Sequence, residues 1–194
     1  MNKQHTLLRA TLALCLSAFA IAQTALPASA ARPASSSVVT NWYYPYQSLL
    51  PTGYTACALG ADLQTCINGA SNGDLIVIDE GVYTESITLD KAVGLYGLSD
   101  GATLVAVSGQ RVLTVTGNMD SSTHIENLTF TGGLAAGGAG GGIHLEPGAT
   151  PLLQSVVISG NAAVLGGGLY AYHSIVANDL TVVNNSASTG GGIY

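Results

Sequence analysis

Side chains that could act as acids, bases or metal ligands are few and scattered in this 194-residue sequence, which holds 5 basic and 11 acidic residues. General acid–base chemistry needs paired titratable groups, and metal binding needs His, Cys or carboxylates at ligand spacing. The histidines share no such spacing, and the aspartates are dispersed through the chain: His124, His144 and His173; Asp62, Asp74, Asp79, Asp90, Asp100, Asp120 and Asp179. The sequence therefore predicts no catalytic residue, no metal site and no cofactor.

The first 30 residues have the pattern of a secretory signal peptide. Lys3 and Arg9 precede an apolar run over 11–22, and Ala28-Ser29-Ala30 forms an A-x-A cleavage site. The apolar run is shorter than the roughly 20 residues that a membrane-spanning helix needs. We therefore expect residues 1–30 to be removed on export, with no membrane insertion within this sequence.

Two cysteines remain after the signal peptide, Cys57 and Cys66. An even pair in an exported chain favours a disulfide, because exported free thiols are prone to oxidation, although two separate buried thiols are the alternative. No second cysteine pair or nearby histidine completes a four-ligand metal set.

The region before the first regular strands divides into two parts. Residues 31–52 are rich in Ser and Pro and then in aromatic residues, which predicts a linker or strap over the fold. Residues 53–74 form a capping segment, in which Leu63, Ile67 and Ala70 recur at helical spacing over 61–70. We expect the apolar face of this helix to bury against the first strand.

From residue 75 onward the sequence consists of short apolar bursts separated by Gly, Asp and Ser. Such bursts, with no helix between them, are typical of an all-β sandwich, barrel or solenoid. The expected strands are 75–78, 87–89, 93–96, 103–107, 112–116 and 124–130.

The last third of the chain repeats, and the repeat selects the solenoid. Glycine triplets begin at Gly140, Gly166 and Gly190, which are 26 and 24 residues apart, and each is followed by Ile or Leu and then by His or Tyr. A second marker runs alongside, aligning Asn127-Leu-Thr-Phe with Ser155-Val-Val-Ile and Asp179-Leu-Thr-Val. Two markers that share one period indicate a stacked array, which alternating antiparallel strands do not predict.

We therefore predict an all-β fold, a right-handed parallel β-helix over 75–194 with a short N-terminal capping helix. Equivalent residues would stack one coil above another, roughly 4.8 Å apart. Asn161 over Asn185 would form a structural amide ladder, and the glycine triplets would supply positive φ at crowded corners. The inward columns would be Ile143, Leu169 and Ile193; Leu128, Val156 and Leu180; and Phe130, Ile158 and Val182.

Two segments carry family resemblances. Residues 62–97 resemble the opening of right-handed β-helix proteins of the pectin lyase-like superfamily, which implies a helix that caps the apolar end of the solenoid. Residues 124–194 resemble the repeats of polymorphic outer-membrane-protein-like surface proteins, although Ile158 and Val182 replace the aromatic of that pattern and Gly133 replaces one Asn.

One enzyme motif is present. Gly81-Val82-Tyr83-Thr84-Glu85 matches the G-x-Y-x-E element of pectin methylesterases, and we expect Tyr83 and Glu85 in a turn of the first coil. The other motifs of pectin methylesterases and polygalacturonases have no counterpart. Lyases of this fold also need clustered Asp and a basic residue, whereas Arg111 and Lys91 stand apart.

The leading hypothesis is an exported, non-catalytic β-helix surface protein, adhesin-like or a structural stalk. Its partner would be a glycan or a cell-surface component, and net charge −6 disfavours nucleic acid. The alternatives are the N-terminal part of a secreted polysaccharide-active enzyme and a carbohydrate-binding solenoid. We expect secretion or surface attachment, with the coils continuing beyond Tyr194 toward an outer-membrane anchor or catalytic coils.

One binding-site hypothesis falls on the repeats. If Ile143, Leu169 and Ile193 point inward, strand alternation sends the next residue of each strand outward. These outward residues, with Tyr172 two positions further on, would form an aromatic strip: His144, Tyr170, Tyr172 and Tyr194. Such a strip could stack on sugar rings, but ring-on-ring packing that stiffens the coil is the favoured role.

Overall fold

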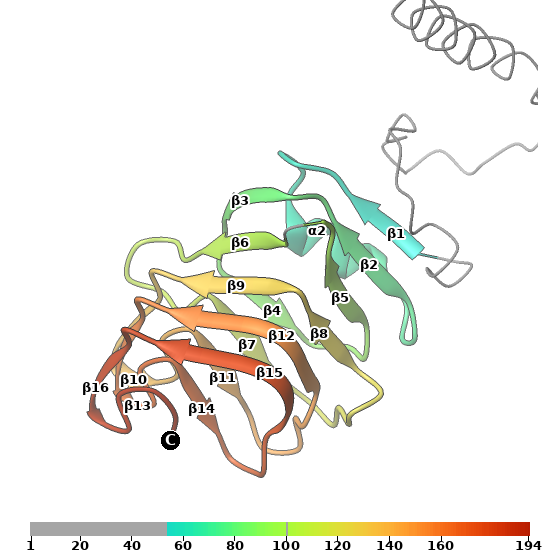
Figure 1. Ribbon diagram of the computed structural model, residues 1–194. Coiled ribbons are helices and arrows are strands. Elements are labelled where there is room, and N and C mark those ends of the chain that lie inside the picture. Colours follow the sequence, from blue (N-terminus) through green and yellow to red (C-terminus); the bar gives the residue numbers. More distant parts are fainter. Residues whose placement is uncertain (1–53, 100) are drawn as a thin grey trace, which may run out of the picture. The chain divides into compact units, whose positions relative to one another are not determined.

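A computed structural model describes residues 54–99 and 101–194, and it shows an all-β, right-handed parallel β-helix with one short helix (Figure 1). Every strand pairing in this part of the chain is parallel. The predicted signal peptide (1–30) and linker (31–52) lie outside the described residues. The fold class predicted from the repeat is therefore confirmed.

The chain passes through its elements in the order β1 (Tyr54–Cys57), α2 (Leu63–Gly69), β2 (Leu75–Ile78), β3 (Gly81–Thr84), β4 (Ile87–Leu89), β5 (Gly94–Gly97), β6 (Ala102–Val105), β7 (Leu113–Val115), β8 (His124–Glu126), β9 (Leu128–Thr131), β10 (Leu134–Ala139), β11 (Ile143–Leu145), β12 (Leu152–Ser159), β13 (Ala162–Leu165), β14 (Leu169–Ala171), β15 (Val176–Val183) and β16 (Ser186–Thr189). The early coils each add two strands to the largest sheet, as β5 with β6 and β8 with β9 show, whereas the later coils add one long strand, β12 or β15.

The strands form three sheets along the solenoid. The largest has the order β1-β2-β5-β8-β12-β9-β6-β3, with β15 paired to β12. A four-stranded sheet follows the order β14-β11-β7-β4, and a three-stranded sheet the order β10-β13-β16. Because β12 pairs with both β8 and β9, it joins the two halves of the largest sheet.

A column of left-handed residues bends the chain between these halves. Asn127, Ser155 and Asp179 have φ of 53°, 49° and 57°, and they occupy one coil position by register. Positive φ turns the chain sharply and is tolerated best by Gly, Asn and Asp. Each of these residues is the first residue of one copy of the second repeated motif. This motif therefore indicates where the chain bends. The bend also splits the expected strand 124–130 into β8 and β9.

The core consists of columns of apolar side chains that stack from coil to coil. Phe130, Ile158 and Val182 are register partners, and the first two are fully buried. Ile143 and Leu169 are also partners and are fully buried. Ile193 continues that column through a bridge to Leu169, as the repeat predicted, and is 43% exposed. No further coil within the described residues covers it.

The first coil contains a strand where the sequence indicated a turn. Tyr83 lies in β3 with its ring buried, and its hydroxyl donates to the Asp79 carbonyl oxygen at 3.1 Å. Burial, with the nearby Asp79 and Glu85 carboxylates, raises the pKa of Tyr83 to about 12. The G-x-Y-x-E element is thus a strand with an inward tyrosine, and only Glu85 lies beyond its end.

The helix α2 covers the first coil as the apolar spacing predicted. Leu63 and Ile67 are fully buried and belong to the same core cluster as Ile76 and Ile78. The Asp62 carboxylate caps the helix by accepting a hydrogen bond from the Thr65 backbone N–H at 2.7 Å. The helix spans Leu63–Gly69, shorter than the expected 61–70.

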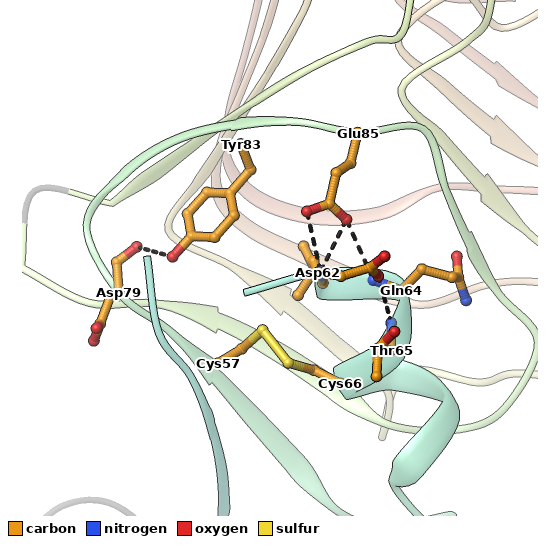
Figure 2. The surroundings of a disulfide bond; sticks show 9 residues. Cys57, Asp62, Gln64, Thr65, Cys66, Asp79, Tyr83 and Glu85 are labelled. Carbon is orange, nitrogen blue, oxygen red and sulfur yellow. Dashed lines mark hydrogen bonds between the residues drawn. A yellow bond between two sulfur atoms is a disulfide. The ribbon is translucent and has the colours of Figure 1, made fainter. Parts of the chain in front are cut away.

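A disulfide ties this helix to the strand before it. Cys57 ends β1 and Cys66 lies in α2, and their sulfur atoms are bonded with the Cα atoms 6.1 Å apart (Figure 2). This separation lies within the usual range for a disulfide. The strand β1, which the sequence did not predict, pairs with β2 and so anchors the disulfide to the first coil.

Polar side chains also join α2 to the first coil. Both oxygens of Glu85 accept from the Leu63 backbone N–H, at 2.9 and 3.1 Å, and one of them also accepts from Gln64 at 3.3 Å (Figure 2). The Gln64 side-chain amide accepts from the Thr88 N–H at 2.7 Å and donates to the Thr88 carbonyl at 3.1 Å. It therefore makes with β4 the two hydrogen bonds that the backbone of a neighbouring strand would make. Lys91 donates to the Asn68 and Ala70 carbonyls at the other end of the helix.

Replacing Glu85 by Ala is expected to lower the free energy of unfolding by about 1–3 kcal/mol, because two backbone N–H groups lose a charged acceptor. Thermal unfolding of the full chain measures this change. Glu80→Ala is the matched control, since Glu80 is an exposed carboxylate at the opposite end of β3. Equal melting temperatures for the two variants would show that Glu85 does not hold the helix.

Candidate functional site

The aromatic residues predicted on the repeats come together as one stack on the four-stranded sheet. His144 and Tyr170 are register partners on β11 and β14, and their ring centroids lie 5.1 Å apart. Tyr194 follows on the other side of Tyr170, with centroids 5.7 Å apart. The structure therefore brings together the residues of the predicted strip, and we call His144, Tyr170 and Tyr194 the aromatic stack.

The rings of the aromatic stack face one another. The interplanar angles are 9° for His144 with Tyr170 and 7° for Tyr170 with Tyr194. Both faces of the Tyr170 ring are therefore covered by neighbouring rings, and only ring edges are directed away from the stack. Sugar rings bind to the open faces of aromatic side chains, so Tyr170 cannot serve as such a platform.

Tyr172 differs from the other members of the predicted strip. It meets Tyr170 edge-on, at an interplanar angle of 80° and a centroid distance of 5.7 Å, and it is 59% exposed. Its position corresponds to that of Glu146 one coil earlier, since Leu145 pairs with Ala171. Tyr172 thus combines high exposure with a perpendicular contact to the Tyr170 ring.

The column that contains the stack changes character along the solenoid. Thr88, Thr114 and His144 are successive register partners on β4, β7 and β11. The column is therefore hydroxyl-bearing in the first two coils and aromatic in the later ones. In this column, only the aromatic side chains have ring surfaces that can contact one another across the distance between coils.

The environment of His144 favours its neutral form. Burial lowers the pKa of His144, and the hydrogen bond between its Nδ1 and the Ala139 carbonyl oxygen, at 3.0 Å, raises it in part. The charge of Arg111 lowers the pKa further, and that of Glu146 raises it. The pKa of Tyr170 is raised, first by desolvation and then by the neighbouring Tyr172 and Tyr194. Both shifts favour the uncharged forms of His144 and Tyr170.

The predicted asparagine ladder is present and forms a buried hydrogen-bond network. Asn161 is 1% exposed, and its backbone N–H and its Nδ2 donate to the Asn185 Oδ1 at 2.9 and 3.0 Å. Asn161 Nδ2 also lies 3.0 Å from the Phe130 carbonyl oxygen, and Asn185 Nδ2 donates to the Ile158 carbonyl at 2.8 Å. The amides therefore satisfy turn backbone one coil away as well as each other.

Gly133 occupies the ladder position in the preceding coil. Its backbone N–H donates to Asn161 Oδ1 at 2.8 Å, so the ladder ends there on a backbone group. A Cβ atom on Gly133 would overlap with the Gly141 carbonyl oxygen, so no side chain fits at this position. This explains why the Asn of the repeat pattern is absent at this position.

The glycine triplets serve two purposes, and the sequence predicted only one. Gly140, Gly166 and Gly190 have φ of 65°, 56° and 62°, as expected for a sharp corner. The following glycines do not have positive φ, and those of the first two triplets lie against the backbone of the next coil. A Cβ on Gly142 would come 2.6 Å from the Gly168 carbonyl oxygen, and one on Gly168 would come 2.7 Å from that of Gly192. These positions exclude side chains because the coils approach closely.

The remaining titratable groups stay apart in space. Within residues 54–99 and 101–194, no three side chains of His, Cys, Asp or Glu gather where a metal ion could be held. His124 and His173 are exposed, and neither joins the aromatic stack. In the same part of the chain, no helix has the length and apolar character needed to cross a membrane.

No protein-family model, curated protein or solved structure matches this chain. The function of the chain is therefore inferred from the geometry of its coils.

Replacing Asn161 by Ala is expected to lower the free energy of unfolding by about 2–4 kcal/mol, because buried backbone groups of Gly133 and Phe130 lose their partners. Chemical denaturation of the full chain gives the value. Asn178→Ala, at an exposed position of β15, is the control and should change stability by less than about 0.5 kcal/mol. Comparable losses of unfolding free energy in both variants would show that the asparagine ladder makes no special contribution to stability.

Acidification is expected to destabilise the chain partly through His144. Because its folded pKa is lowered below the ordinary value near 6.5, the unfolded state binds more protons in the window below that value. The contribution is fully present above about pH 6.5 and is lost as the pH falls through this window to the lowered folded pKa. The melting temperature of His144→Gln should therefore fall less between about pH 7 and about pH 5 than that of the wild type.

The control for this pH dependence is His173→Gln, which changes an exposed histidine. It should keep the pH dependence of the wild type. If His144→Gln instead follows the wild-type curve, the neutral form of His144 does not contribute to folding.

Proposed function

We propose that this chain is an exported, non-catalytic surface module, either adhesin-like or a structural stalk. The observation that carries the proposal is the uninterrupted stacking of equivalent residues from coil to coil. Backbone strands run along the whole solenoid, and the asparagine ladder and the aromatic stack join its later coils. A fold that repeats the same contacts in each layer is suited to act as a stiff extended scaffold.

The chemistry of the outward groups supports a structural role. Tyr170 has both ring faces covered, and the titratable side chains of the described residues remain dispersed. In the enzyme-like element, the Tyr83 ring is buried and its hydroxyl donates to the Asp79 carbonyl. Glu85 accepts hydrogen bonds from the first turn of α2. These residues therefore have structural partners that account for their presence.

We further propose that the chain belongs to the pectin lyase-like superfamily of β-helices and that its last coils are repeats of the polymorphic outer-membrane-protein-like kind. The capping helix, the glycine corners and the Asn161–Asn185 pair support this assignment. Export through a signal peptide over 1–30 and attachment at the cell surface are part of the same proposal.

A carbohydrate-binding role is a second candidate, and Tyr172 is the residue that favours it. Its ring is 59% exposed and touches the aromatic stack only edge-on. A glycan or another cell-surface component could contact this ring, whereas the stacked rings hold it in place. The two candidates predict different consequences for Tyr170 and Tyr172.

The full chain is tested with Tyr170→Ala and Tyr172→Ala, measuring melting temperature, retention on a polysaccharide array and release of soluble sugar products. For a structural module, Tyr170→Ala should lower the melting temperature by several degrees, since each stacked pair contributes about 0.5–1.5 kcal/mol. Tyr172→Ala, which removes one aromatic contact rather than three, should lower the melting temperature less and leave retention unchanged, and no protein should release products.

Two outcomes would count against the structural module. Retention that is lost in Tyr172→Ala at an unchanged melting temperature would establish the carbohydrate-binding candidate. Product release above that of the heat-denatured chain would show catalysis and overturn the non-catalytic proposal.

A further inference from the structure

One face of the solenoid carries a regular array of small side chains. The strands β3, β6 and β9 and the second halves of β12 and β15 lie one above another (Figure 1). Inward residues such as Leu104 and Phe130 alternate with outward ones along each strand. The first outward column, read through the register, is Val82, Thr103, Thr129, Val157 and Thr181.

A second outward column runs beside the first, two residues further along each strand. Its members are Thr84, Val105, Thr131, Ser159 and Val183. We call the two columns together the threonine–valine face. Apart from Ser159, all of its side chains are β-branched, and none is charged or aromatic.

The threonine–valine face is a two-dimensional lattice of methyl and hydroxyl groups. Neighbouring coils place equivalent residues about 4.8 Å apart, and outward residues on one strand are about 6.6 Å apart. β-Branched side chains have few χ1 rotamers, so the groups are held in place before any partner arrives. A partner would therefore meet a preorganised surface and lose little side-chain entropy on binding.

The dimensions and charge of this face restrict its partner. The two columns cover roughly 300 Å², well below the roughly 800 Å² per partner that a stable protein interface buries. The face bears no charge although the chain has net charge −6, so it offers nothing to an ionic ligand or an oppositely charged protein. It also lacks the aromatic rings on which crystalline polysaccharides stack.

A solid that repeats in two dimensions can match such a lattice over its whole area. We propose that the threonine–valine face binds ice. The methyl groups hold water that is already ordered, and the Thr hydroxyls hydrogen-bond within the same layer. A neutral, rigid and repeating face therefore complements a neutral and repeating solid. This activity is independent of the surface role proposed above, because it uses a different sheet from the aromatic stack.

The test measures the partition of the full chain between a slowly growing ice front and the remaining liquid. Thr129→Tyr places a bulky ring at the centre of the face, and Thr114→Tyr is the matched control. Both threonines are partly exposed and lie between coils, but Thr114 belongs to the four-stranded sheet. The wild type and Thr114→Tyr should enter the ice, and Thr129→Tyr should be excluded from it.

Thr181→Lys, at an exposed position of the same face, gives a second reading if Thr129→Tyr fails to fold, as judged by thermal unfolding. It should also be excluded from the ice. Exclusion of the wild type, or equal entry of all variants, would overturn the proposal. A wild-type dimer in sedimentation equilibrium that Thr129→Tyr dissociates, without entry into ice, would instead assign the face to a second copy of the chain.

Discussion

Hydrogen bonding between successive coils, in fixed register, is the constraint on which the rest of this structure depends. Interior strands such as β11 and β12 pair with the coil before and the coil after, so a residue is held directly over its counterpart. Whatever stands at a coil position must therefore fit against the same position one layer away. Phe130, Ile158 and Val182 satisfy this requirement in the core, as His144 and Tyr170 do outside it.

The close approach of the coils explains the most unusual feature of the composition, its 25 glycines. At the triplets the backbones of neighbouring coils leave no space for a Cβ atom, as Gly142 and Gly168 show. The turn on the other side of β13, between β12 and β13, leaves backbone groups without strand partners, and the Asn161 and Asn185 amides bind them. Where the coils touch, only glycine fits. Where the pairing between strands is interrupted, asparagine side chains supply the missing hydrogen bonds.

Among the residues that the structure describes, no earlier coil lies beneath the full length of the first coil, and a different set of interactions covers it. The helix α2 buries Leu63 and Ile67 over the core, and the Gln64 amide takes the place of a strand along β4. The disulfide and Glu85 hold this helix on the first coil. The cap therefore supplies both the apolar contacts and the backbone partners that a coil supplies elsewhere.

The sequence by itself determined the parallel β-helix, the amide ladder and the helix that caps the first coil. The spacing of Gly140, Gly166 and Gly190 reports the length of a coil, and the apolar spacing of Leu63 and Ile67 reports a helical face, because both are properties of the local chain. Only the tertiary structure decided that Tyr83 lies in a strand, that Glu85 and Gln64 bind across to the cap and that the rings of the aromatic stack meet face to face. These contacts join residues more than 20 positions apart, and their geometry follows from how one coil settles on the next, which no local pattern of residues encodes.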